Sequence, residues 1–195
     1  MLVLVWGRPL RRLPAEIGAA MGLLAAEASV AMERADLLAT MSELAHMDPL
    51  TGLPNRRSWD FHVTRSLALA RRELRPITAA LFDLDRFKDY NDAHGHQAGD
   101  RFLKETAAAW QQQLRAGDVL ARWGGEEFAV LLPNCSQLDA EMVLERLRSV
   151  TPGGQTCSAG ASEARSGDSP ATLIPRVDKA LYQAKTGGRD QLVMA

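Results

Sequence analysis

The sequence has few cysteines, almost no net charge and no long apolar run. Its only cysteines, Cys135 and Cys157, form no CxxC pair and lie near no histidine cluster, which argues against structural zinc or a disulfide scaffold and favours the reducing cytoplasm. Lysine and arginine total 23 against 24 acidic residues, so nothing attracts DNA, RNA or anionic lipid globally. The apolar stretch 1–7 is too short for a signal sequence or a membrane segment. Any polyanion site must therefore be local.

The chain of 195 residues, 46% of them hydrophobic, is long enough for one core of ordinary size plus an appended helix. We interpret residues 1–14 as the remnant of an upstream sensor domain, with a single strand over 1–7. Residues 15–47 lack proline and predict one long linking helix, which ends where Asp48-Pro49 forbids continuation. The main domain is expected over 48–195.

The long helix has an apolar seam of alternating three- and four-residue steps, as in a coiled coil. Ser42 interrupts the seam, and many of its members are small. An amphipathic helix that packs on its own domain is the alternative. The seam positions are Ile17, Met21, Leu24, Ala28, Ala31, Ala35, Leu38 and Ala45.

The main domain alternates apolar runs with helical patterns, which predicts the α+β class: an antiparallel-dominated sheet with a βαββαβ palm-like core, as in nucleotidyl cyclases, and helices on one face. Gly124-Gly125 predicts a hairpin turn. Helices are predicted over 55–74, 86–94, 98–114, 136–150 and 170–186, and strands over 77–82, 118–122, 127–132, 156–162 and 190–194.

Two acidic pairs are the first candidates for chemistry. In Phe82-Asp83-Leu84-Asp85 an apolar strand ends in carboxylates two residues apart, which share one face of the strand. Mg²⁺ prefers such oxygen ligands and fills its remaining positions with water and substrate phosphate.

The second pair, Glu126-Glu127, directly follows two glycines, which leave open space for a large substrate. Neighbouring strand residues point to opposite sides, so one of the two is expected to share a metal with Asp83, and we favour Glu126. Either pair alone is more often a solvated hairpin end. Together they suggest a nucleotidyl transferase in which carboxylates hold metal ions around an in-line attack.

Between these pairs lies a polar segment. Asn91 and Asp100 are suited to bind the edge of a guanine base. A carboxylate accepts hydrogen bonds from guanine N1–H and the exocyclic amine, while a side-chain amide can donate to O6 or N3. The His94-x-His96 pair has no further ligands after it, so a helix cap is the better interpretation than zinc.

Near the carboxyl end, Lys185 ends a helix and Arg189 follows two glycines. Both are suited to phosphate oxygens, and an arginine can engage two at once. Cations that offset a helix dipole are an equally good interpretation of these two residues alone.

Arg122-Trp123-Gly124-Gly125-Glu126-Glu127-Phe128 resembles the GGDEF signature in its GGEEF form. The resemblance extends over roughly 48–192 through motifs that follow in the same order: the segment from Asp48 to Arg57, the segment from Phe82 to Lys88, Asn91-Asp92, Gly95-His96-x-x-Gly99-Asp100 and Ala180-Leu181-Tyr182-x-Ala184-Lys185. The family consists of diguanylate cyclases, which join two GTP molecules into cyclic di-GMP.

The resemblance implies a role for each matched residue. Asp83, the carbonyl of Leu84 and Glu126 would bind Mg²⁺ (or Mn²⁺), with Glu127 supporting the charge balance. Asn91 and Asp100 would read guanine. The triphosphate would be bound by Lys88, Lys185, Arg189 and main-chain groups near Phe87.

The resemblance also implies a homodimer of half-sites, and allosteric inhibition by the product at an RxxD site formed by Arg115, Asp118 and Arg146. The chain departs from the family pattern in a short connection between Val150 and Thr156 and in Asp190, where asparagine is frequent. Two other functions stay open: a non-catalytic module that binds GTP or cyclic di-GMP, and the cyclisation of a single nucleotide.

Overall fold

The computed structural model describes residues 15–44 and 46–195. The chain divides into two units, residues 1–45 and 46–195. Helix α1 (Ala15–Leu44) is the described part of the first unit. The predicted sensor remnant and its strand lie outside the described residues.

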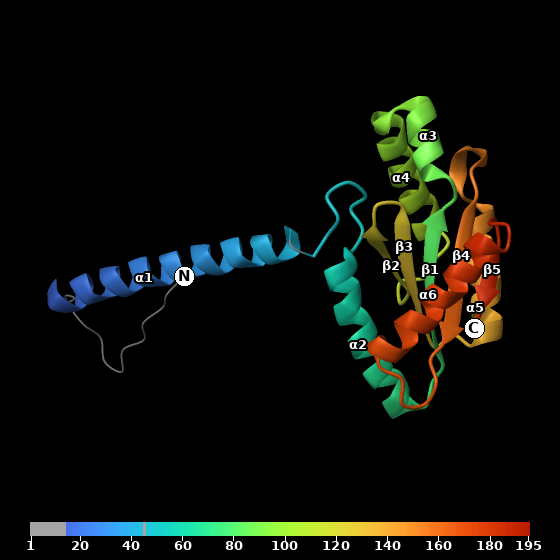
Figure 1. The fold of residues 1–195 in the computed structure, drawn as a ribbon. Coiled ribbons are helices and arrows are strands. Elements are labelled where there is room, and N and C mark those ends of the chain that lie inside the picture. The colour runs from blue at the N-terminus through green and yellow to red at the C-terminus, as the bar shows by residue number, and fades with distance from the viewer. Residues whose placement is uncertain (1–14, 45) are drawn as a thin grey trace. The chain divides into compact units, whose positions relative to one another are not determined.

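The second unit contains the remaining elements, in close agreement with the predicted order (Figure 1). They are α2 (Arg56–Glu73), β1 (Ile77–Leu84), α3 (Phe87–His94), α4 (His96–Gln111), β2 (Val119–Gly124), β3 (Glu127–Pro133), α5 (Gln137–Ser149), the short 3-10 helix η1 (Pro152–Gly154), β4 (Cys157–Glu163), α6 (Pro170–Thr186) and β5 (Leu192–Met194).

The five strands form one sheet in the order β2-β3-β1-β4-β5. All neighbours are antiparallel except β4 and β5, which are parallel. The predicted α+β class and its βαββαβ core, which runs from β1 to β4, are therefore confirmed.

Helices cover both faces of the sheet, so the prediction of helices on one face was wrong. Every residue of the central strand β1 is buried, and its side chains alternate between two clusters. Phe82 and Leu84 pack with side chains of α4 and α5 such as Trp110. Ala79 and Leu81 pack with side chains of α2 and α6. Figure 1 shows α6 crossing the face of the sheet at β4.

Helix α6 packs backbone to backbone on β4 at Gly160. A Cβ added at this residue would lie 2.0 Å from the amide nitrogen of Leu181 and 2.5 Å from the carbonyl oxygen of Val177. Only glycine permits this approach. The position of α6, which carries Lys185 in its last turn, is therefore set directly by the sheet.

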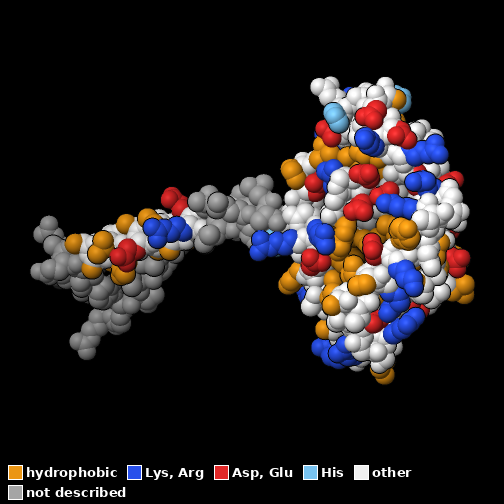
Figure 2. Space-filling view, viewed as in Figure 1, with side chains coloured by type: hydrophobic (Ala, Val, Ile, Leu, Met, Phe, Trp, Pro, Cys, Tyr) orange, Lys and Arg blue, Asp and Glu red, His pale blue; other side chains and the backbone are white. Residues whose placement is uncertain are grey.

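Helix α1 belongs to the first unit. Apolar side chains on its surface are exposed, among them Leu23 at 65% and Leu24 at 54%, and hydrophobic atoms lie among charged ones along the part of the helix coloured in Figure 2. None of the helices in the described chain is long and apolar enough to cross a membrane.

Candidate active site

The end of β1 places a carboxylate in a mostly buried position. The side chain of Asp83 is 12% exposed, and its Oδ2 lies 2.6 Å from Nζ of Lys185. Burial raises the pKa of Asp83 above its ordinary value, against the lowering effect of Lys185, and the negative charges of Glu126 and Glu127 raise it further. We call Asp83, Glu126 and Glu127, together with the ammonium of Lys185 that pairs with Asp83, the acidic corner.

The β2–β3 turn brings the second acidic pair to this corner. In the register of β1 and β3, Glu127 lies directly opposite Asp83, and the amide of Leu84 donates to the carbonyl of Glu126 at 3.3 Å. Glu126 nevertheless raises the pKa of Asp83 more than Glu127 does. Both glutamates are thus near Asp83, and the geometry alone selects neither as the metal ligand. Leu84 has a buried side chain, so only its backbone is available to a ligand.

Arg122 fixes the conformation of this turn, a role that the sequence analysis missed. Its guanidinium contacts both carboxylate oxygens of Asp48 at 3.1 Å and donates to the carbonyl of Gly125 at 2.7 and 3.1 Å. Burial alone would raise the pKa of Asp48, but hydrogen bonds from Thr51 and Arg122 more than offset it and lower that pKa. Both residues belong to quoted motifs, but their contact joins residues 74 positions apart.

Helix α2 braces the same turn from the side. The Arg56 guanidinium lies 4.4 Å from the centre of the Trp123 ring, and Trp59 meets that ring edge-on at 5.0 Å. Cation–π and edge-to-face contacts of this kind favour one ring position. These contacts hold Trp123 in place, and the Gly124-Gly125 turn follows it directly in the chain.

Asp85 does not join Asp83. Its carboxylate, in a residue 6% exposed, accepts hydrogen bonds from the hydroxyls of Thr156 and Ser158, each at 2.7 Å. The amide of Asp190 donates to it at 3.0 Å. The two carboxylates of this motif therefore have different partners, Lys185 for Asp83 and these three neutral donors for Asp85.

The α3–α4 hairpin contains the predicted guanine-binding residues and extends beyond the Leu84 end of β1 (Figure 1). The Oδ1 atom of Asn91 is buried and has no hydrogen-bond partner among the described residues. A Cβ on Gly99 would lie 1.8 Å from that atom, so the glycine makes room for the amide. Asp100 is exposed.

Two further predicted residues lie at the start of α3. Phe87 is buried, 8% exposed, and stacks near Tyr90; Lys88 is exposed. His94 stacks on Tyr90 at 4.5 Å and bonds its carbonyl through Nδ1 at 3.0 Å. In residues 15–44 and 46–195, no three His, Cys, Asp or Glu side chains are arranged so that they could hold a metal ion.

The segment after α6 presents Arg189 at the surface. The amide of Arg189 donates to the carbonyl of Ala184 at 3.0 Å, so the chain folds back over the helix end. Arg189 is exposed and close in sequence to Lys185, which is already paired with Asp83.

The predicted RxxD residues line one pocket of about 350 Å³ on another side of the domain. Nε of Arg115 lies 3.0 Å from Asp118, whose side chain is 4% exposed, while that of Arg115 is 59% exposed. Arg146 enters from α5 and donates to the carbonyl of Gln113 at 2.8 Å. The structure therefore brings Arg146 beside the Arg115–Asp118 pair, although strands β2 and β3 separate them in the sequence.

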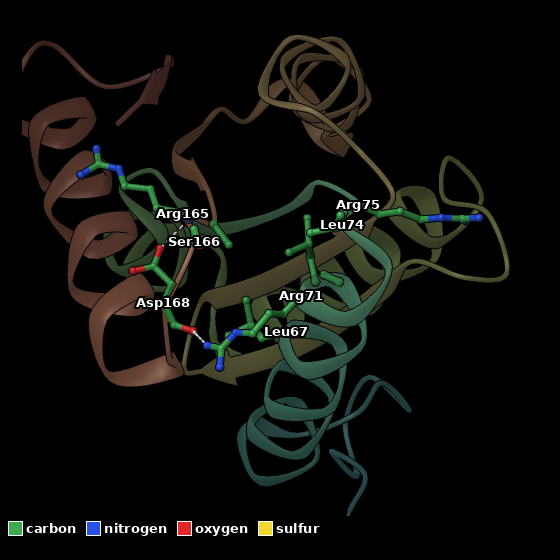
Figure 3. A pocket seen from close by; sticks show the side chains of 11 residues that line it. Leu67, Arg71, Leu74, Arg75, Arg165, Ser166 and Asp168 are labelled. Carbon is green, nitrogen blue, oxygen red and sulfur yellow. Dashed lines mark hydrogen bonds between the residues drawn. The ribbon is translucent and has the colours of Figure 1, made fainter.

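A smaller pocket of about 170 Å³ lies near the other end of β1, where Ile77 begins the strand (Figure 3). Arg71 of α2 donates to the carbonyl of Asp168 at 3.2 Å across it. Figure 3 shows Arg75 and Arg165 pointing away from one another. These cations do not converge, so the pocket is no anion site.

Comparisons with known proteins agree with this geometry. Residues 45–191 match the family model described as diguanylate cyclase, GGDEF domain. Diguanylate cyclase DgcP from Pseudomonas aeruginosa is 40% identical over 158 residues, which are 76% of this chain and 24% of DgcP. Response regulator PleD from Caulobacter vibrioides is 38% identical over 164 residues, 77% of this chain and 36% of PleD. The chain thus spans about a quarter to a third of these relatives.

Solved structures are also similar. The crystal structure of the coiled coil and GGDEF domain of DgcB from Caulobacter crescentus, in complex with c-di-GMP, gives a TM-score of 0.84 at 29% identity, over 91% of this chain and 100% of that one. The active GGEEF domain of a diguanylate cyclase from Vibrio cholerae gives 0.69 at 31% identity, over 73% and 97%. The family match covers most of the chain and agrees with the fold and with the acidic corner at the end of β1, so this protein belongs to the GGDEF family of diguanylate cyclases, which are nucleotidyl transferases.

Proposed function

We propose that this chain, with its GGEEF form of the signature, condenses two GTP molecules into cyclic di-GMP and releases two pyrophosphates. The observation that carries the proposal is the acidic corner, where Asp83 pairs with Lys185 and the negative charges of Glu126 and Glu127 act on it. GTP is a cytoplasmic metabolite, so we place the reaction in the cytoplasm.

We infer a divalent cation at the acidic corner. Burial is the main cause of the raised pKa of Asp83 and Lys185 opposes it, while Glu126 and Glu127 raise it further, so three carboxylates lie near one lysine. We assign Mg²⁺ (or Mn²⁺) to Asp83, the Leu84 carbonyl and Glu126, with Glu127 adding charge. When bound, the ion polarises phosphate oxygens and stabilises the charge that develops on them.

The α3–α4 hairpin supplies the base site. The unpartnered amide oxygen of Asn91 costs free energy until a ligand donor reaches it, which favours a nucleobase there. Asp100, also on this hairpin, accepts from the N1–H and exocyclic amine of guanine.

The triphosphate is bound by Lys88, Lys185, Arg189 and main-chain groups near Phe87. Lys185 pairs with Asp83 at 2.6 Å, so its ammonium lies at the acidic corner, where the phosphates are proposed to bind. Its charge and that of Arg189 neutralise the phosphate oxygens as pyrophosphate leaves.

Each domain binds one GTP, so the site is complete only in a two-fold homodimer. There the ribose 3′-hydroxyl of one nucleotide attacks the α-phosphorus of the other, and the reaction occurs twice per product. We propose α1 as the coiled-coil linker that brings the domains together and carries a signal from an upstream GAF-type sensor. The exposure of Leu24 supports a partner for its seam.

Leu24→Asn is expected to weaken dimerisation and activity together, measured by sedimentation and product formation. Leu23→Asn is the matched control, because Leu23 is also exposed but lies off the seam. If both variants weakened dimerisation and activity equally, the proposed coiled-coil seam would be wrong.

We also propose that cyclic di-GMP inhibits the enzyme at the Arg115–Asp118–Arg146 pocket, where arginines meet guanine bases and phosphates and Asp118 accepts from guanine. The crystallised DgcB domain was in complex with c-di-GMP. Arg115→Ala is expected to leave the initial rate unchanged while removing inhibition by added product. Persistent inhibition in this variant would exclude the pocket.

The central test is incubation of the purified chain with GTP and Mg²⁺, with cyclic di-GMP and pyrophosphate followed by chromatography. Glu126→Ala is the inactive control. Product from the wild type alone supports the cyclase and the acidic corner together. GTP binding and dimerisation without product would favour the non-catalytic module, and a cyclic mononucleotide would favour the single-nucleotide reaction.

A further inference from the structure

Asp85 has a complete set of partners, none of which is a cation. Its Oδ1 accepts from Ser158, and its Oδ2 accepts from Thr156 and from the amide of Asp190. Burial of a carboxylate is unfavourable unless its oxygens are hydrogen-bonded, and here all three donors are neutral. The group therefore serves a structural purpose at the end of β1.

The segment held by Asp85 has an unusual backbone. Gly188, Arg189 and Asp190 have φ values of +125°, +64° and +47°. A side chain in the left-handed region is disfavoured, and two consecutive non-glycine residues there persist only where their surroundings fix them.

Besides the bond from the Arg189 amide to the carbonyl of Ala184 at 3.0 Å, two anchors fix this segment at residue 190. The backbone anchor is the bond from the Asp190 amide to Asp85 at 3.0 Å. The side-chain anchor is an ion pair between Asp190 and Arg148 of α5. Since Asp190 is exposed at its side chain and exposed ion pairs contribute little, the buried Asp85 is the stronger anchor.

Asp83 and Asp85, the two carboxylates at the end of β1, thus hold the two ends of the segment from Lys185 to Asp190. Asp83 contacts Lys185, and Asp85 contacts the amide of Asp190. Arg189 lies between these points.

We propose that Asp85 is a positioning residue, which holds residues 188–190 in the left-handed conformation and thereby directs Arg189 toward the triphosphate. This inference rests on the proposed function only for the task of Arg189. That Asp85 holds the segment is a separate claim with its own measurement.

The first measurement is hydrogen exchange of the amides of 187–191 in the full chain. Asp85→Asn replaces one acceptor oxygen with a donor, and exchange at Asp190 is expected to become roughly ten- to a hundredfold faster, the range for a lost hydrogen bond to a charged group. Asp168→Asn is the matched control, because it removes another hydrogen-bonded carboxylate that is 10% exposed. Unchanged exchange in Asp85→Asn would overturn the proposal.

The second measurement is a double-mutant cycle on kcat/KM for GTP. Arg189→Ala is expected to cost roughly tenfold or more in the wild type and in Asp168→Asn. In Asp85→Asn the same change is expected to cost less than about threefold, because Arg189 is already displaced. Additive losses would overturn the positioning role, since a general loss of stability gives the same Arg189 effect in every background.

If Asp85→Asn does not fold, Thr156→Val takes its place. It removes a donor to the same oxygen as the Asp190 amide and keeps the side-chain volume, so the effects are expected in the same direction but smaller. If the wild type does not use GTP, the proposed function fails, and the exchange measurement still decides whether Asp85 holds the segment.

Discussion

The two ends of β1 each lie near a mostly buried carboxylate, and the two are in opposite electrostatic situations. At the Leu84 end, burial and neighbouring acids raise the pKa of Asp83. Near the Ile77 end, Asp168 contacts Arg176 at 2.5 Å and accepts from Thr172 and the Arg165 amide, each at 2.8 Å. These contacts lower the pKa of Asp168 to about 2, with Arg176 the largest cause. At the Leu84 end, three carboxylates lie near one lysine and leave negative charge for a ligand. Near the Ile77 end, the charge of Asp168 is already paired with Arg176.

The largest expected effect is that of Asp83→Asn. Loss of a metal ligand should lower the rate of cyclic di-GMP formation by roughly a hundredfold or more. The melting temperature should stay the same or rise, because a raised pKa means that the ionised form of Asp83 opposes folding. Chromatography measures the rate, and thermal unfolding measures the melting temperature. A strong drop in melting temperature would show that ionised Asp83 stabilises the fold, contrary to the contrast with Asp168.

Arg122→Ala should have the next largest effect. It frees the turn from Asp48, and we expect kcat to fall roughly ten- to a hundredfold through misplacement of Glu126 and Glu127. Arg122→Lys keeps the charge but loses the two-oxygen contact, so it should recover only part of the activity. Full recovery would show that charge alone matters.

Asp168→Asn should reduce stability and spare activity. The shift from 3.8 to about 2 corresponds to roughly 2 kcal/mol of unfolding free energy at neutral pH. Because the pKa is lowered in the folded state, this contribution is present above about pH 4 and is lost as the pH falls toward 2. Urea unfolding at several pH values should show that the unfolding free energy of the wild type falls over this pH range more than that of the variant. If the two proteins lost stability in parallel, the prediction would be wrong.

The smallest effect is expected for Asp190→Asn, which restores the residue frequent in the family. Its side chain is 57% exposed, and an exposed ion pair contributes at most about 1 kcal/mol. Unfolding in urea and the rate of product formation should both stay close to wild type. A large loss of activity would show that the Arg148 contact, not Asp85, holds Arg189.

The sequence predicted the order and type of the elements, because each apolar run and turn is local. It did not predict helices on both faces, although the signal was present: the run from Ile77 to Leu84 is apolar almost throughout, as in strands buried on both sides. The parallel pairing of β5 with β4 depends on the path of the chain and has no local signal.

The candidate site shows the same division. Asp83, Glu126 and Glu127 were found from spacing, and the structure brings them together. The partners of Asp85 lie about seventy residues or more away, at Thr156, Ser158 and Asp190, so spacing alone made it resemble a second metal ligand. The Arg122–Asp48 contact was missed for the same reason.

The close approach at Gly160 has a consequence for how this enzyme tolerates mutation. Since α6 rests on the bare backbone of β4, any side chain at this position would act as a wedge and lift the helix by the width of a methyl group or more. The wedge would displace Lys185, several residues further along α6, from Asp83. In a library that samples every amino acid at every position, we expect residue 160 to accept glycine alone, although it touches no substrate.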